Sequence, residues 1–152
     1  MKTIGVIGPA AGLCTQDMYA FAVELGKVIG NKGYNLVCGG KDGIMEAACL
    51  GIAETNAQSI AIIPEDDKSF ANTYAKIVIP TGIGTARNKV IINTADVLVA
   101  IAGGAGTLSE IAFAWQQGKK VFCVTQFGGV AAEMAGKQID TRYKNLLMPE
   151  IN

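Results

Sequence analysis

The chain has 152 residues, of which half are apolar and 19 are glycine, a size and composition that favour one domain over residues 1–152 with a substantial core. Its 13 basic and 13 acidic residues cancel, so it lacks the basic character that nucleic-acid binding demands. It contains no histidine, which excludes histidine-based catalytic triads, histidine metal ligands and histidine proton shuttles.

Apolar runs alternate with helical patterns along the chain. The runs predict buried strands at residues 3–7, 34–38, 59–63, 76–79, 96–101 and 120–125. The first helix is expected between Thr15, which can cap it, and Gly33, which ends it. Further helices are expected at residues 44–55, from about Arg87, at 106–117 and at 130–135; the rest of the tail has no clear pattern. This alternation predicts a Rossmann-like, three-layer α/β/α fold with a mainly parallel sheet.

The four cysteines are scattered, and no two of them have the spacing of a metal site. Cys38, Cys49 and Cys123 lie in apolar runs and are expected in the core, whereas Cys14 lies in a loop. Free thiols fit a reducing cytoplasm, and no apolar run is long enough to cross a bilayer. We therefore expect a cytoplasmic protein without a metal, and the acidic residues 65–67 are expected to form a solvated loop.

Four glycine-bearing loops follow predicted strands. In parallel α/β sheets ligands bind beyond the carboxyl ends of the strands, where the strand order reverses. Four such loops at one edge predict a site for a nucleotide-sized ligand. The candidate ligand-binding residues in these loops are Gly8, Pro9, Gly39, Gly40, Gly82, Gly103, Gly104, Gly106 and Thr107.

The most informative loop is residues 102–110, where a strand, a glycine-rich turn and a helix start follow one another. Glycines let backbone N–H groups approach a phosphate, and a helix N-terminus favours negative charge. Glu110 stands one turn into the helix, where it could act on the ligand. In the alternative interpretation, Thr107 and Glu110 form a capping box and only satisfy the backbone of the helix start.

This run resembles the Pro-Gly-Gly-x-Gly-Thr-x-x-Glu motif of the Lonely Guy and lysine decarboxylase-like (SLOG) superfamily, with Ala102 in place of the proline. Residues 39–45 resemble the family's second glycine-rich turn, and Arg87 stands where the family has an arginine. The resemblance covers residues 2–124. In its short length and its tripeptide Ala86-Arg87-Asn88, the chain is most similar to a small branch that includes molybdenum-cofactor carrier proteins.

The resemblance implies one of two functions. Lonely Guy enzymes hydrolyse the N-glycosidic bond of nucleoside 5′-monophosphates; by this likeness Arg87 and Glu110 would be catalytic, with Arg87 positioning the ribose phosphate or the leaving base. Glu110 would then stabilise the oxocarbenium-like transition state or orient water. The carrier branch implies non-catalytic binding of a phosphorylated pterin of the molybdopterin type. Asn88, where the family often has lysine, disfavours hydrolysis of cytokinin-type ribotides.

The expected partners follow from the same observations. We expect a small phosphorylated ligand, no nucleic acid and no membrane. A DNA-processing role is a more distant alternative, because proteins that handle nucleic acid share this fold, but the balanced charge opposes it. The resemblance also implies a homo-oligomer, a dimer or a tetramer, with Phe113 and Trp115 together on one helix.

Overall fold

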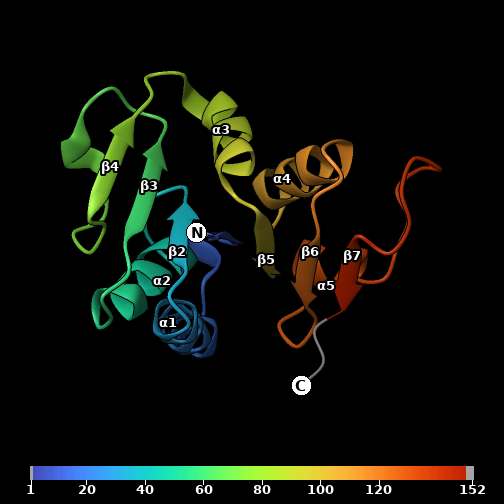
Figure 1. Cartoon of the computed structure of the whole chain (residues 1–152), viewed down its shortest axis with the longest axis horizontal. Coiled ribbons are helices and arrows are strands. Elements are labelled where there is room, and N and C mark those ends of the chain that lie inside the picture. Colours follow the sequence, from blue (N-terminus) through green and yellow to red (C-terminus); the bar gives the residue numbers. More distant parts are fainter. Residues whose placement is uncertain (1, 150–152) are drawn as a thin grey trace.

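A seven-stranded sheet forms the centre of the molecule in the computed structural model, which describes residues 2–149 (Figure 1). Its strands are β1 (Thr3–Ile7), β2 (Asn35–Cys38), β3 (Ser59–Ile63), β4 (Ile77–Pro80), β5 (Val97–Ile101), β6 (Val121–Val124) and β7 (Leu147–Pro149). Their order is β4-β3-β2-β1-β5-β6-β7, and every neighbouring pair is parallel. The predicted parallel α/β fold is confirmed.

Helices cover both faces of this sheet, which makes three layers. They are α1 (Gln16–Asn31), α2 (Ile44–Ala53), α3 (Arg87–Thr94), α4 (Ala105–Gln116) and α5 (Gly129–Met134). Helices α1 and α2 pack together on one face, and α3 and α4 pack together on the other (Figure 1). The short α5 packs against β5, β6 and α4.

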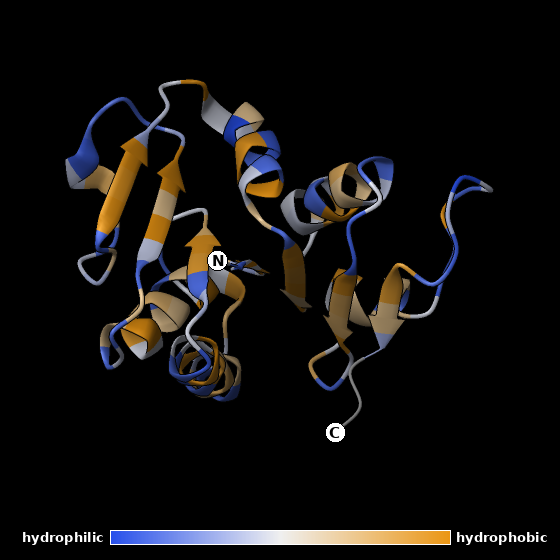
Figure 2. Ribbon diagram, viewed as in Figure 1, coloured by the Kyte–Doolittle hydropathy of each residue, from blue (hydrophilic) through white to orange (hydrophobic). Residues whose placement is uncertain are grey.

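Two apolar clusters hold the layers together, one beneath each helix pair. The strands are the most hydrophobic elements of the chain (Figure 2), as expected for a parallel sheet buried on both faces. Trp115 is only 1% exposed and donates its indole N–H to Asp140 at 2.9 Å. Its burial confirms a core position and removes it from any subunit interface.

Local signals in the sequence located the early elements closely. β1 and β3 match the predicted ranges, and the Thr15 hydroxyl accepts the Met18 N–H at 3.2 Å, as a helix cap does. Gly33, with φ of 80°, follows the end of α1. Strand β7 was not predicted: it is three residues long and is recruited from the tail by pairing with β6.

The strand order places a switch point between β1 and β5. From β1 the chain continues toward β2, β3 and β4, whereas from β5 it continues toward β6 and β7. The loops that leave the carboxyl ends of β1 and β5 therefore diverge, and a crevice between them is the expected ligand site of such a sheet.

Candidate functional site

A cavity of about 290 Å³ lies at this switch point. Its lining comes from the end of β1 and the loop that follows, from Gly39 after β2, from Met45 of α2, from the start of α3 and from the first turns of α4. Eight of the predicted site residues are among its lining: Gly8, Pro9, Gly39, Arg87, Gly104, Gly106, Thr107 and Glu110. The fold thus brings together residues that are up to about a hundred positions apart in the chain.

Three predicted residues lie outside this lining. Gly40 packs on β3, where an added Cβ would lie 2.6 Å from Ala61 Cβ. The N–H of Gly82 donates to the Glu65 carbonyl at 2.9 Å and joins the ends of β3 and β4. Gly103 lines a separate, adjacent pocket. Their geometry therefore gives no support to ligand contacts from Gly40 or Gly82 in the cavity.

The first turn of α4 faces the cavity with unused hydrogen-bond donors. The helix begins at Ala105, and the first N–H groups of an α-helix have no acceptor within the helix. Among the described residues, the N–H groups of Ala105, Gly106 and Thr107 make no hydrogen bond to a loop or side chain. Together with the helix dipole they form a site that suits an anion.

The capping-box interpretation is wrong. The N-cap of α4 is Gly104, with no side-chain cap hydrogen bond, so Thr107 lies inside the helix. Thr107 packs back onto the turn, and a Cβ at Gly103 would overlap its side chain. Gly103 also has φ of 90°, which favours glycine. Because Thr107 is not the cap, Glu110 is not part of a backbone cap either.

Glu110 is buried in the cavity wall, with 7% of its surface exposed. Among the described residues it makes no hydrogen bond and no salt bridge. Burial raises the pKa of Glu110 to about 8, and the positive charge of Arg87 opposes this shift only in part. The carboxyl group is therefore largely protonated at neutral pH, when it can donate a proton or a hydrogen bond.

Arg87 supplies the positive charge of the cavity from the first position of α3. Its guanidinium donates to the Asn88 side-chain oxygen and, at 3.5 Å, to the Gly39 carbonyl. Its Nε is buried and has no hydrogen-bond partner among the described residues. Burial lowers the pKa of Arg87 while Glu110 and Glu65 raise it. An arginine with an unused buried donor is well suited to an incoming anion.

Asn88 connects the two helices that carry these groups. It is buried, and its amide donates to the Ser109 hydroxyl at 3.3 Å, which in turn donates to the Gly106 carbonyl at 2.6 Å. Where the sequence indicated only a missing cation, the structure shows an uncharged link that holds Arg87 beside the start of α4.

The loop after β1 is held in place by the start of α2. The Ile44 N–H donates to the Pro9 carbonyl at 3.1 Å, and the Ala11 N–H donates to Asp42 at 2.9 Å. Gly43 has φ of 65°, and an added Cβ would lie 2.5 Å from the Pro9 carbonyl oxygen. These contacts give the cavity a preformed wall.

Sequence reasoning missed Leu13, which belongs to the same loop and lines the cavity while remaining 75% exposed. The available signal was an apolar residue between glycine and cysteine in a loop that leaves the carboxyl end of a strand. Leucine in a loop is common, and only its position on the cavity wall distinguishes it.

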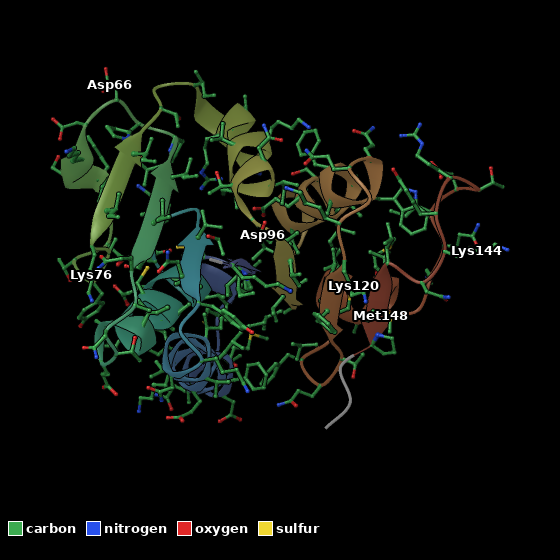
Figure 3. The ribbon with its side chains drawn as sticks, viewed as in Figure 1. Asp66, Lys76, Asp96, Lys120, Lys144 and Met148 are labelled. Carbon is green, nitrogen blue, oxygen red and sulfur yellow. The ribbon has the colours of Figure 1, made fainter. Side chains whose placement is uncertain are left out.

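The remaining predictions concern metals, thiols and membranes. Residues 2–149 contain no group of three or more side chains that could hold a metal ion, and none of their helices has the length and hydropathy of a membrane span. Cys38, Cys49 and Cys123 are buried as free thiols. Of the acidic residues 65–67, Glu65 forms a salt bridge with Lys41 at 2.8 Å. Asp66 lies beyond the carboxyl end of β3, at the end of the sheet opposite Lys76, which precedes β4 (Figure 3).

Known proteins with similar sequences and structures fall into both predicted branches. The crystal structure of TM1055 is 31% identical, covers 99% of this chain and 91% of its own, and superposes with a TM-score of 0.84. The molybdenum cofactor binding protein of the phototrophic bacterium Rippkaea orientalis is 34% identical over 81% of this chain and 76% of its own, with a TM-score of 0.77. A cytokinin riboside 5′-monophosphate phosphoribohydrolase of Mycobacterium tuberculosis is 27% identical over 72% of this chain and 60% of the enzyme.

The match to a defined family extends over nearly the whole chain. Residues 1–148 match the model of the SLOG cluster4 family, and this range includes every residue that lines the cavity. The predicted relationship to the SLOG superfamily is therefore confirmed, and the chain belongs to the SLOG cluster4 family.

Proposed function

We propose that this protein binds a phosphorylated, nucleotide- or pterin-like small molecule in the switch-point cavity, with the phosphate at the first turn of α4. The observation that carries the proposal is that the N–H groups of Ala105, Gly106 and Thr107 on the cavity wall have no hydrogen-bond partner among residues 2–149. A phosphate oxygen would satisfy donors that the protein leaves unused, and the helix dipole would favour its charge.

Arg87 adds the charge that a phosphate requires. Its guanidinium lines the same cavity, and its Nε lacks an acceptor among the described residues. A charge-assisted hydrogen bond to a phosphate would compensate the cost of burying this donor. The protonated Glu110 would not repel the anion at neutral pH, because it carries little charge there.

Within this function we propose non-catalytic carriage of a phosphorylated pterin of the molybdopterin type. The support is the likeness to the Rippkaea orientalis protein, which is closer in sequence than the phosphoribohydrolase. The uncharged Asn88, engaged with Arg87 and Ser109, adds no further acid or base to the cavity.

A second candidate is hydrolysis of the N-glycosidic bond of a nucleoside 5′-monophosphate. Its specific support is Glu110, buried beside the same cavity with a pKa raised to about 8, which suits proton transfer near neutral pH. The protonated carboxyl could give its proton to the leaving base as the bond between C1′ and the base nitrogen breaks. Water would add at C1′, and the proton that this water loses would restore the carboxyl group. The products would be the free base and ribose 5-phosphate.

One set of measurements tests both candidates on the purified chain. A ligand that binds the folded state raises its stability, by about 2.7 kcal/mol at a hundredfold excess over Kd. Inorganic phosphate, adenosine 5′-monophosphate and molybdopterin should raise the Tm, and adenosine should not. Release of ribose 5-phosphate from any nucleoside monophosphate, abolished in Glu110→Gln, would favour hydrolysis over carriage. An unchanged Tm with every phosphorylated compound would refute the binding proposal.

A further inference from the structure

A second, smaller pocket adjoins the candidate phosphate cavity. Its volume is about 190 Å³, and the loop after β1 forms part of its wall. Pro9 and Leu13 line both spaces, and the turn at Gly103 and Gly104 separates them, since Gly103 lines the smaller pocket and Gly104 the larger. The two spaces therefore adjoin each other at Pro9 and Leu13.

The chemistry of this pocket differs from that of the cavity. Its other lining residues are Met18, Ala102, Phe127 and Gly129, so within the described part of the chain no charged or strongly hydrogen-bonding side chain lines it. The cavity, by contrast, contains Arg87, Asn88 and Glu110. The apolar faces of an uncharged ring suit this lining, whereas a charged phosphate would lose its hydrogen bonds to water there without replacement.

The walls of the pocket are held by the protein's own contacts. The Phe127 ring packs edge-on against Phe21, with ring centroids 5.4 Å apart. The N–H groups of Val130 and Ala131 donate to the carbonyls of Gly103 and Ala102, each at 3.0 Å. A Cβ at Gly129 would lie 2.7 Å from the Ala102 carbonyl carbon, so the backbone itself forms this wall. Backbone without side chains lets a flat group approach closely.

The sizes of the two spaces support a shared ligand. Small-molecule sites have volumes of about 300–1,000 Å³. The phosphate cavity, at about 290 Å³, lies at the lower end of this range, and the adjoining pocket offers about 190 Å³ more. Leu13 is 75% exposed at their junction, where a ligand that extends from one space to the other would cover it.

We propose that the small pocket is the subsite for the planar heterocycle of the ligand, and that Leu13 and Phe127 contact that ring. This inference rests on the proposed function, because the phosphate at α4 anchors the same molecule. The ligand class is then a phosphomonoester joined by a short polar linker to an uncharged ring, and the ring contributes affinity through apolar contacts.

The test compares ligands that differ only by the ring. Neopterin phosphate is paired with glycerol 3-phosphate, and adenosine 5′-monophosphate with ribose 5-phosphate; Kd is measured by calorimetry. For at least one pair we expect the ring to tighten binding tenfold or more. Leu13→Ala should remove most of that gain, about tenfold, and change the Kd of the ringless partner by a clearly smaller factor. Phe127→Leu, which keeps an apolar contact with Phe21, should reduce the gain by a smaller factor.

Val28→Ala is the matched control, because Val28 is 50% exposed on α1 and lines neither space. It should change no Kd. Equal affinity with and without the ring in both pairs, or an equal loss in Leu13→Ala for ringed and ringless ligands, would overturn the subsite while leaving phosphate binding intact. Failure of all four compounds to bind would instead refute the proposed function, and the subsite with it.

Discussion

Arg87 and Glu110 line the same cavity and form no salt bridge with each other. The guanidinium donates to Asn88 and Gly39, and the buried carboxyl group stays largely protonated near neutral pH. An ion pair would cancel the cavity's positive charge, whereas this arrangement leaves the charge of Arg87 available to a ligand. This relationship leads to the first two predictions.

Stability should fall with rising pH because of Glu110. Its pKa is raised in the folded protein and ordinary in the unfolded chain, so between these values the folded state holds a proton that the unfolded state releases. The associated stability is complete below the ordinary glutamate pKa and is lost as pH rises to about 8. Glu110→Gln should flatten thermal stability between pH 5 and 9. Glu133→Gln, on an exposed glutamate of α5, should keep the slope.

Loss of Arg87 should weaken phosphate binding more than it affects folding. A hydrogen bond to a charged group contributes about 1.5–3 kcal/mol, so Arg87→Met should raise the phosphate Kd by about 10- to 150-fold. Arg142, the chain's other arginine, is exposed in the tail and serves as the control in Arg142→Met. Calorimetry with phosphate measures both variants. Equal affinities for Arg87→Met and the wild type would contradict the anion site.

Gly106→Ala should raise the stability of the fold and at the same time weaken phosphate binding. Gly106 lies inside α4, and a Cβ there would meet only Asn88 Nδ2 at 4.0 Å. Alanine in a helix is favoured over glycine by about 0.5–1 kcal/mol, so the variant should unfold at a higher temperature. Its methyl group would narrow the site for phosphate and raise the Kd.

Gly106→Asp tests the same position by charge and should abolish phosphate binding. Asn56→Asp adds the same charge at an exposed residue that lines a different pocket, and it should leave the Kd unchanged. If Gly106→Asp and Asn56→Asp had similar phosphate affinity, the first turn of α4 would not be the anion site.

Ala102→Pro should destabilise the protein even though proline occupies this position in the family motif that the chain resembles. Ala102 has φ of 48°, whereas proline requires about −65°. The turn would have to change path, at a cost of about 1–3 kcal/mol or more. Ala102→Gly, which tolerates this φ, is the control and should remain folded. Chemical denaturation compares the two, and a proline variant as stable as the wild type would show that the turn takes another path.

Self-association should depend on β4 rather than on α4. Trp115 is buried, but Ile77 and Ile79 on the edge strand β4 are each 43% exposed. Apolar side chains on an exposed edge favour pairing with another chain. We expect light scattering to show that the wild-type protein is a dimer or tetramer. The Ile79→Lys variant should have a lower mass, closer to that of the monomer. Phe122→Lys, at a 38% exposed site on β6, is the control.

The order of elements could be predicted because local rules decide it. Alternating apolar runs specified the parallel strands, and Thr15 and Gly33 marked the ends of α1 by hydrogen bonding and backbone conformation. The glycine-rich turn before α4 was recognised because few residue types other than glycine adopt the positive φ that such a turn requires. The sequence by itself thus determined the fold class and the position of the glycine-rich turn before α4.

Only the tertiary structure decided which residues share the cavity. Gly82 and Glu110 both follow turn signals in the sequence, but strand pairing turned the Gly82 N–H to Glu65, whereas burial placed Glu110 on the cavity wall. The capping-box prediction was wrong because α4 begins at Ala105 with Gly104 as its N-cap, so Thr107, which packs on Gly103, lies inside the helix. The raised pKa of Glu110 likewise depends on desolvation, which arises only when distant segments pack together.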